Sequence, residues 1–338
     1  MGGGLVLPAA ALVAQHTDWH ALFYGAAGLG TLSVLLTLVA VPESPIRSEG
    51  TFDTVGALGL SAGLVLFLLP LTKGGDWGWT SATTLGLFTS AAAVLTLWAL
   101  LQLRLKAPLV DLRTTARPTV LFTNLASITV GVSVYVIPIT LPQLLQLPAS
   151  TGYGLGQSMV VAGLLVAPFG LTMVLMAPVY ARLSARYGSK ATLVLGLLII
   201  EVAYGAGLGL MSAPWQSIVT TVLLGAGGGL AVSSLPALIT GAVPLSDTGA
   251  ANGLNTLMRC MGMSLASAVV GSVLAGTATN VDGVALPTLH GLRTAFLITT
   301  GAVTLGLILA LFLPGRPAAA KPHTPTTDKE GTAARAVA

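Results

Sequence analysis

Residues 193–200 read Leu-Val-Leu-Gly-Leu-Leu-Ile-Ile, an apolar run that lacks the alternation of a β-barrel strand. Similar runs recur along the chain, and residues 64–71 are another example. Backbone polar groups within lipid must pair inside the protein, so such runs indicate helices. About 20 apolar residues at 1.5 Å each cross a hydrocarbon layer about 30 Å thick. The pattern therefore predicts helices that span a membrane.

Composition extends this interpretation to the whole chain. Only 8% of the 338 residues are charged, against about 25% in soluble domains. Many glycines and prolines suit a membrane bundle, where small residues let helices approach closely. We predict an all-α fold, a polytopic membrane helical bundle with about ten transmembrane helices. The predicted segments are residues 2–15, 20–42, 54–72, 81–103, 119–145, 157–181, 191–211, 215–241, 254–278 and 292–314.

The basic residues predict the orientation of the bundle. One set of loops, together with the C-terminal tail, holds Arg47, Arg104, Lys106, Arg113, Arg117, Arg182, Arg186, Lys190, Arg316, Lys321, Lys329 and Arg335. The opposite loops hold Lys73 and Arg293, and Arg259 lies within a segment. Because basic loops stay in the cytoplasm, we expect a cell-membrane (inner-membrane) protein with both termini cytoplasmic.

Conventional enzyme chemistry has little support in the sequence. The four histidines, His16, His20, His290 and His323, lack metal-ligand spacing, and Cys260 is the only cysteine. Residues 225–229 read Gly-Ala-Gly-Gly-Gly but lack the Lys of a phosphate-binding loop. They lie within an apolar segment and instead predict close helix packing. We expect no enzymatic activity, no cofactor, no metal and no nucleic-acid partner, and place the protein's partners among membrane lipid and small molecules.

A basic loop provides the first specific motif. Residues 181–190 read Ala-Arg-Leu-Ser-Ala-Arg-Tyr-Gly-Ser-Lys between two predicted spans. The stretch resembles the Gly-x-Leu-Ala-Asp-Arg-x-Gly-Arg-Arg loop of the major facilitator superfamily, although Ala181 and Ala185 replace its Gly and Asp. The resemblance implies a gating loop that contains Arg182, Arg186, Gly188 and Lys190. A basic loop with no role beyond orientation is the alternative.

Further stretches resemble the fourteen-helix drug:proton antiporter branch of this superfamily, in order along residues 1–314. They are residues 19–24 and 41–44, Phe52-Asp53-x-x-Gly56, residues 76–79, 138–143, 162–168 and 249–262. The resemblance implies proton-coupled efflux of small lipophilic or cationic compounds such as drugs and antibiotics, with a proton gradient as the driving force. The alternative function is a transport-inactive membrane fragment that only binds or assembles with other membrane proteins.

The same resemblance implies how the chain is organised. Residues 1–44 match the last two helices of the N-terminal six-helix bundle, and residues 45–118 match two linker helices. Residues 119–316 match the C-terminal six-helix bundle, and residues 317–338 form a polar tail that we expect to be disordered. We therefore expect the N-terminal half to lack its first four helices, the chain not to transport by itself, and self-association through the face left by those helices.

Polar residues inside spans are the candidates for a proton or substrate pathway. Glu201 lies near the middle of its span, where it could carry a proton, bind a cationic substrate, or simply bond to a neighbouring helix. Arg259 shares a helical face with Asn252 and Asn255, and could line an inner gate or extend to the membrane interface. The span 119–145 and its end add Asn124, Tyr135, Gln143 and Gln146, close to the kink-inducing Pro138 and Pro142. These side chains could line a cavity or only join helices.

Overall fold

The structure is a computed structural model that describes residue 13 and residues 20–40, 53–105, 108–281 and 284–314. Within those ranges, nine helices are long and apolar enough to cross a membrane. They are α2 (His20–Ala40), α3 (Thr54–Trp77), α4 (Ala82–Arg104), α6 (Pro118–Gln146), α7 (Met159–Tyr187), α8 (Ser189–Gly207), α9 (Pro214–Thr240), α10 (Thr248–Gly276) and α11 (Leu289–Leu311). Apart from Val13, the predicted first segment lies outside the described residues, as does the tail.

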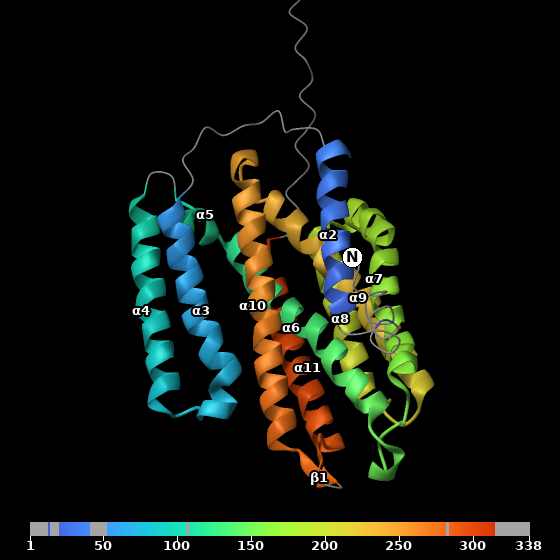
Figure 1. Ribbon diagram of the computed structural model, residues 1–338. Helices are drawn as coiled ribbons and strands as arrows, with labels where there is room; N and C mark the ends of the chain where they lie inside the picture. The colour runs from blue at the N-terminus through green and yellow to red at the C-terminus, as the bar shows by residue number, and fades with distance from the viewer. Residues whose placement is uncertain (1–12, 14–19, 41–52, 106–107, 282–283, 315–338) are drawn as a thin grey trace, which may run out of the picture.

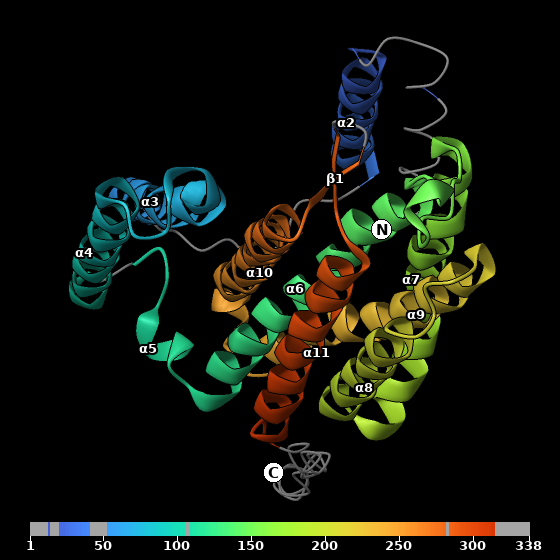
Figure 2. The ribbon, with the colours of Figure 1, turned by 90° about the horizontal axis from the view of Figure 1, so that it is seen from below.

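Helices α6 to α11 form one bundle and run alternately in opposite directions (Figure 1). We call the end where α6 begins, α7 meets α8, and α11 ends the basic end; the other is the hairpin end. Helix α6 is central and contacts α7, α9, α10 and α11 (Figure 2). Near the middle of α6, the Ser133 carbonyl accepts a hydrogen bond from the buried Tyr204 of α8. The Tyr204 ring packs edge-on against Phe296 of α11. Tyr204 therefore ties three helices of the bundle together.

Glycines set the closest helix contacts of the bundle. A Cβ atom placed on Gly262 of α10 would lie 2.0 Å from the Ile128 carbonyl oxygen of α6. Likewise, a Cβ on Gly131 of α6 would lie 2.2 Å from the Arg259 carbonyl oxygen. On α9, Gly225 meets the backbone of α7 and Gly227 meets that of α8. The prediction that residues 225–229 serve close packing is confirmed, because side chains there would force the helices apart.

Helices α3 and α4 pair beside the bundle, and α3 lies against α10 (Figure 2). Asp53 caps α3 and accepts hydrogen bonds from Gly56 N and from Gln102 Nε2 of α4, both at 2.7 Å. Trp98 Nε1 donates to the Gly56 carbonyl at 2.7 Å. The Gln102 amide, with help from the Gly56 N–H, holds the pKa of Asp53 below its ordinary value. One carboxylate thus fixes the start of α3 to the end of α4.

Two other features complete the described fold. A short helix, α5 (Leu112–Thr115), precedes α6. A small antiparallel hairpin, which we did not predict, joins α10 to α11: β1 (Thr279–Val281) pairs with β2 (Val284–Leu286), and Thr279 lies opposite Leu286. The all-α class therefore describes the membrane-spanning part, and the hairpin belongs to a loop.

Candidate functional site

The predicted pathway residues fall into separate groups rather than one site. A buried amide cluster joins α6 to α10, and a single carboxyl lies between α8 and α11. The gating loop and a cavity occupy the basic end. Each group has its own geometry.

The amide cluster consists of Asn124, Ser127 and Asn255. The Asn255 Nδ2 donates to Asn124 Oδ1 at 2.9 Å and to Ser127 Oγ at 2.6 Å. Asn255 is 1% exposed and Asn124 is 4% exposed, so the cluster is enclosed by α6 and α10. The Asn124 Nδ2 is buried without a hydrogen-bond partner among the described residues. The two asparagines predicted separately therefore form one interhelical contact, which retains one unused donor.

Arg259 and Asn252 flank this cluster on α10. The Arg259 backbone lies against Gly131, and its half-buried guanidinium makes no ion pair with any residue in the described ranges. Asn252 Nδ2 donates to Thr240 Oγ1 at 3.2 Å and to the Thr248 carbonyl at 3.1 Å. Asn252 Oδ1 is buried and accepts no hydrogen bond from the described chain. Within the described residues, α10 thus carries one unsatisfied amide oxygen and one cation without an ion pair.

The other polar residues of α6 do not join the cluster. Tyr135 is half-buried, whereas Gln143 and Gln146 are exposed at the hairpin end. Gln146 Nε2 bonds its own helix at the Pro142 carbonyl, 3.1 Å away. At 1.5 Å per residue, Gln143 lies roughly 28 Å along α6 from Asn124. The helix continues through both prolines, so these residues occupy one helix but different depths.

Glu201 lies in the groove between α8 and α11. Thr304 Oγ1 donates to Glu201 Oε1 at 2.7 Å and also bonds the Thr300 carbonyl of its own helix at 3.0 Å. Glu201 Oε2 is buried and has no partner in the described residues. Among the described residues, the helices that hold the amide cluster, α6 and α10, donate no hydrogen bond to this carboxyl. Sequence reasoning missed Thr304, because hydroxyl residues that bond their own helix are common in these spans.

The predicted gating loop connects α7 to α8 through Gly188, whose φ of 85° suits glycine. Lys190 extends to α11, where its ammonium donates to the carbonyls of Leu311, at 2.9 Å, and Leu313. These carbonyls belong to the last turn of α11 and to the residues that follow it, where a cation is favourable. Of the other predicted loop residues, Arg182 is exposed, and the Arg186 guanidinium lies 5.3 Å from the centre of the Tyr187 ring. The loop thus joins the α7–α8 turn to the end of α11.

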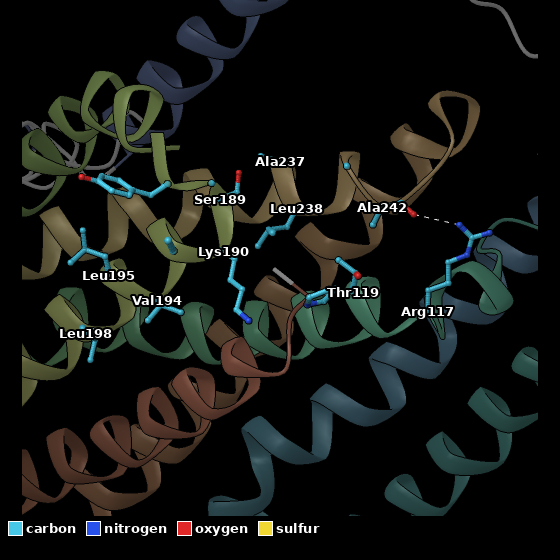
Figure 3. A pocket seen from close by; sticks show the side chains of 15 residues that line it. Arg117, Thr119, Ser189, Lys190, Val194, Leu195, Leu198, Ala237, Leu238 and Ala242 are labelled. Atoms are coloured by element: carbon cyan, nitrogen blue, oxygen red, sulfur yellow. Dashed lines mark hydrogen bonds between the residues drawn. The ribbon is translucent and has the colours of Figure 1, made fainter. Parts of the chain in front are cut away.

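A cavity of about 630 Å³ opens beside Lys190 (Figure 3). Arg117, which precedes α6, and Thr119 of α6 line one side, and Val194, Leu195 and Leu198 of α8 line another. Ala237, Leu238 and Ala242 contribute from α9 and its end. Arg117 Nη1 donates to the Ala242 carbonyl at 3.4 Å. The cavity combines a cationic end with an apolar wall, and of its lining residues the sequence analysis singled out Gly188 and Lys190 as part of the predicted gating loop.

Comparison with known proteins gives the context for these sites. Residues 119–337 match the family model of the Major Facilitator Superfamily. Multidrug resistance protein Stp of Mycobacterium tuberculosis is 29% identical over 268 residues, which cover 78% of this chain and 48% of Stp. A tetracycline resistance determinant of Streptomyces rimosus is 29% identical, with coverage of 75% and 71%. The tetracenomycin C resistance and export protein of Streptomyces glaucescens is 27% identical, with coverage of 80% and 50%. The chain spans about half the length of Stp and of the tetracenomycin exporter.

Proposed function

The chain belongs to the major facilitator superfamily, and from this premise we propose that it provides the C-terminal six-helix bundle and two linker helices of a drug exporter. The exporter is of the fourteen-helix, proton-driven branch. The observation that carries this proposal is the family match over α6 to α11, together with relatives named for drug resistance and export. In the proposed organisation, α3 and α4 are the linker helices and α2 belongs to the N-terminal bundle.

Transport in this superfamily needs two bundles that close alternately around a site near the middle of the membrane. The α6–α11 bundle supplies one side of that site. We propose that α10, through Asn252, Asn255 and Arg259, contributes to this side. A small lipophilic or cationic compound is the proposed substrate, in keeping with the drugs in the names of the relatives. Unused hydrogen-bonding atoms on Asn124 and Asn252 support a polar role for this side, since buried polar atoms are normally paired.

A proton gradient is the proposed energy source, and Glu201 is the proposed proton-binding group. An unpaired charge inside a span is costly, so an isolated carboxyl there is a functional candidate. The proposed orientation places the basic end, with the gating loop, in the cytoplasm of a cell whose inner membrane holds the protein. At this end Lys190 links the loop to the end of α11.

Efflux from a bacterial host that lacks its own exporters tests the proposal. One strain expresses the chain alone, and a second expresses it joined behind the N-terminal helices of the Streptomyces rimosus relative. We expect the joined form to lower the accumulation of tetracycline or a lipophilic cationic dye, and an uncoupler to abolish this effect. Absence of efflux from both well-expressed forms would overturn the proposal. Efflux by the chain alone would show instead that copies assemble to supply the second side.

A further inference from the structure

We propose that the cavity at the basic end binds the headgroup of an anionic phospholipid, with an acyl chain along α8. The cavity has the two chemistries that such a lipid requires. Cationic and hydroxyl groups lie at the end of the membrane-spanning helices, and aliphatic side chains continue from them along the span (Figure 3). This inference concerns a site apart from the proposed transport pathway and does not depend on transport.

The cationic part consists of Arg117 and Lys190. Neither side chain forms an ion pair with a carboxylate in the described ranges, and no acidic residue lines the cavity there. Their hydrogen bonds go to backbone carbonyls, which leave the net positive charge in place. Lys190 has a third N–H beyond the two that bond Leu311 and Leu313, and Arg117 has further N–H donors. A lipid phosphate would therefore meet two unneutralised cations.

Hydroxyl-bearing residues add hydrogen-bond donors at the cationic end of the cavity. Thr119 lies between the positions of Arg117 and Lys190 in Figure 3, and Ser189 lines the cavity beside Lys190. Arg117 and Thr119 flank the first residue of α6, and Ser189 and Lys190 begin α8. Both helix starts are at the basic end, so these polar groups all lie at the end of the spans that a headgroup would occupy. Oxygen-rich headgroups accept hydrogen bonds from all of these side chains.

The apolar wall continues toward the middle of the span. Leu195 and Leu198 are 38% and 47% exposed, although they lie on a helix of the bundle. Together with Val194 they line the cavity on the α8 side, about one to two helical turns from Lys190. Part of this face of α8 is thus left open by the described residues. An acyl chain that starts from a phosphate at Lys190 would lie against these leucines and bury them.

Binding to the purified full chain in a neutral detergent tests the proposal. The probes are phosphatidylglycerol, phosphatidylcholine and inorganic phosphate, and the readouts are lipid retention by native mass spectrometry and the thermal unfolding midpoint. We expect phosphatidylglycerol to be retained and to raise the midpoint, whereas the other two probes have little effect. Equal effects of phosphatidylcholine, or full stabilisation by phosphate alone, would overturn the proposal.

Variants connect the binding to this cavity. Arg117→Gln should weaken phosphatidylglycerol binding about fivefold, and its combination with Lys190→Gln should weaken binding roughly 25-fold. Because Lys190 also caps α11, Lys190→Arg serves as the charge-preserving variant and should retain binding. Leu195→Gln with Leu198→Gln, at exposed positions, should lower binding without removing charge. Arg113→Gln is the matched control, because Arg113 is an exposed basic residue near the start of α6 that does not line the cavity. Unchanged binding in the double charge variant would overturn the proposal.

Discussion

Asn255 of α10 donates a hydrogen bond to Asn124 of α6 at 2.9 Å, across 131 residues of sequence. Both amides are buried where lipid and protein offer few other polar partners. Such a contact fixes how α10 is rotated against α6, because a modest turn of either helix would separate the two side chains. It therefore positions Arg259, one helical turn beyond Asn255, relative to the rest of the bundle.

Removal of this amide contact should weaken the bundle. Asn255→Ala leaves the polar atoms of Asn124 and Ser127 buried without their partner, and we expect a loss of about 1 kcal/mol in unfolding free energy. Unfolding in mixed detergent micelles measures it. A double-mutant cycle with Asn124→Ala should give a coupling energy of roughly 0.6 kcal/mol. Gln146→Ala is the control, since Gln146 is exposed and bonds only its own helix. Equal losses for Asn255→Ala and Gln146→Ala would contradict this role.

Gly262 offers a second test of the α6–α10 interface. Its added Cβ would lie 2.0 Å from the Ile128 carbonyl oxygen, so Gly262→Ala must push the helices apart. We expect a destabilisation of about 1–3 kcal/mol. Gly271→Ala, on the same helix with nothing within 4 Å of the new Cβ, is the matched control. That variant should be neutral or slightly stabilising, because Ala favours helix over Gly. A Gly262→Ala variant with unchanged stability would show that α6 and α10 can move apart without a free-energy cost.

Asp53 predicts an acid dependence for the α3–α4 pair. Its folded-state pKa is lowered, first by the Gln102 amide and then by the Gly56 N–H, so folding favours the carboxylate. The stabilisation is present above the ordinary Asp pKa of about 4 and is lost as pH falls through the lower folded pKa. Trp98 fluorescence reports on this contact, because its indole N–H bonds the Gly56 carbonyl.

The measurement uses a form in which Trp98 is the only tryptophan. We expect its thermal midpoint to fall on acidification below about pH 4. Asp53→Asn should be less stable at neutral pH, by about 1 kcal/mol, because hydrogen bonds to a charged acceptor are stronger than those to a neutral amide oxygen, and it should lose this acid dependence. An Asp53→Asn variant with the same acid transition would assign that transition to another group.

Orientation makes a direct prediction about labelling in cells. In a Cys260→Ser background, single cysteines at Lys73 and Arg293 should react with an impermeant thiol reagent added outside intact cells. Cysteines at Arg113 and Arg182 should react only after the membrane is opened. All four positions are exposed, so accessibility depends on the side of the membrane. The reverse pattern would place the basic end outside.

The spans were predictable from the sequence, whereas their contacts were not. Hydropathy finds a helix because lipid demands about 20 apolar residues in a row. It does not reveal which face of α8 meets α11, because both lipid and protein neighbours accept Leu and Val. The Glu201–Thr304 pair was therefore found only in the structure. The glycines at 225–229 are an exception, because a cluster of glycines within one apolar span indicates a close helix contact.

Residues that share one predicted span can also have different surroundings in the structure. Asn124 and Gln143 share one predicted span, yet the first is buried against α10 and the second is exposed near the hairpin end. A sequence gives depth along a helix but not the rotation that distinguishes these faces. The missed hairpin had a local signal, since Asp282-Gly283 separates two short runs that begin with Thr279 and Val284. With three residues per strand, that signal was too short to stand out in a chain of long apolar runs.

The last prediction concerns Glu201 and rests on the proposed proton coupling. One hydrogen bond from Thr304 is the contact that the described structure gives its carboxyl, and Oε2 has no partner. No ion pair holds this carboxyl within the described structure. Glu201→Gln keeps the shape and an acceptor for Thr304, but it cannot exchange a proton. In the joined exporter, we expect Glu201→Gln to flatten the pH dependence of dye efflux at normal expression.

Thr304→Val separates proton binding from packing. It removes the hydroxyl but leaves the carboxyl, so we expect efflux to remain pH-dependent, with a shifted profile. Labelling with a lipophilic carbodiimide gives a readout that does not require transport: the chain should react at Glu201, and Glu201→Gln should not. If Glu201→Gln exports with an unaltered pH profile, the residue only joins α8 to α11, and proton coupling must use another group.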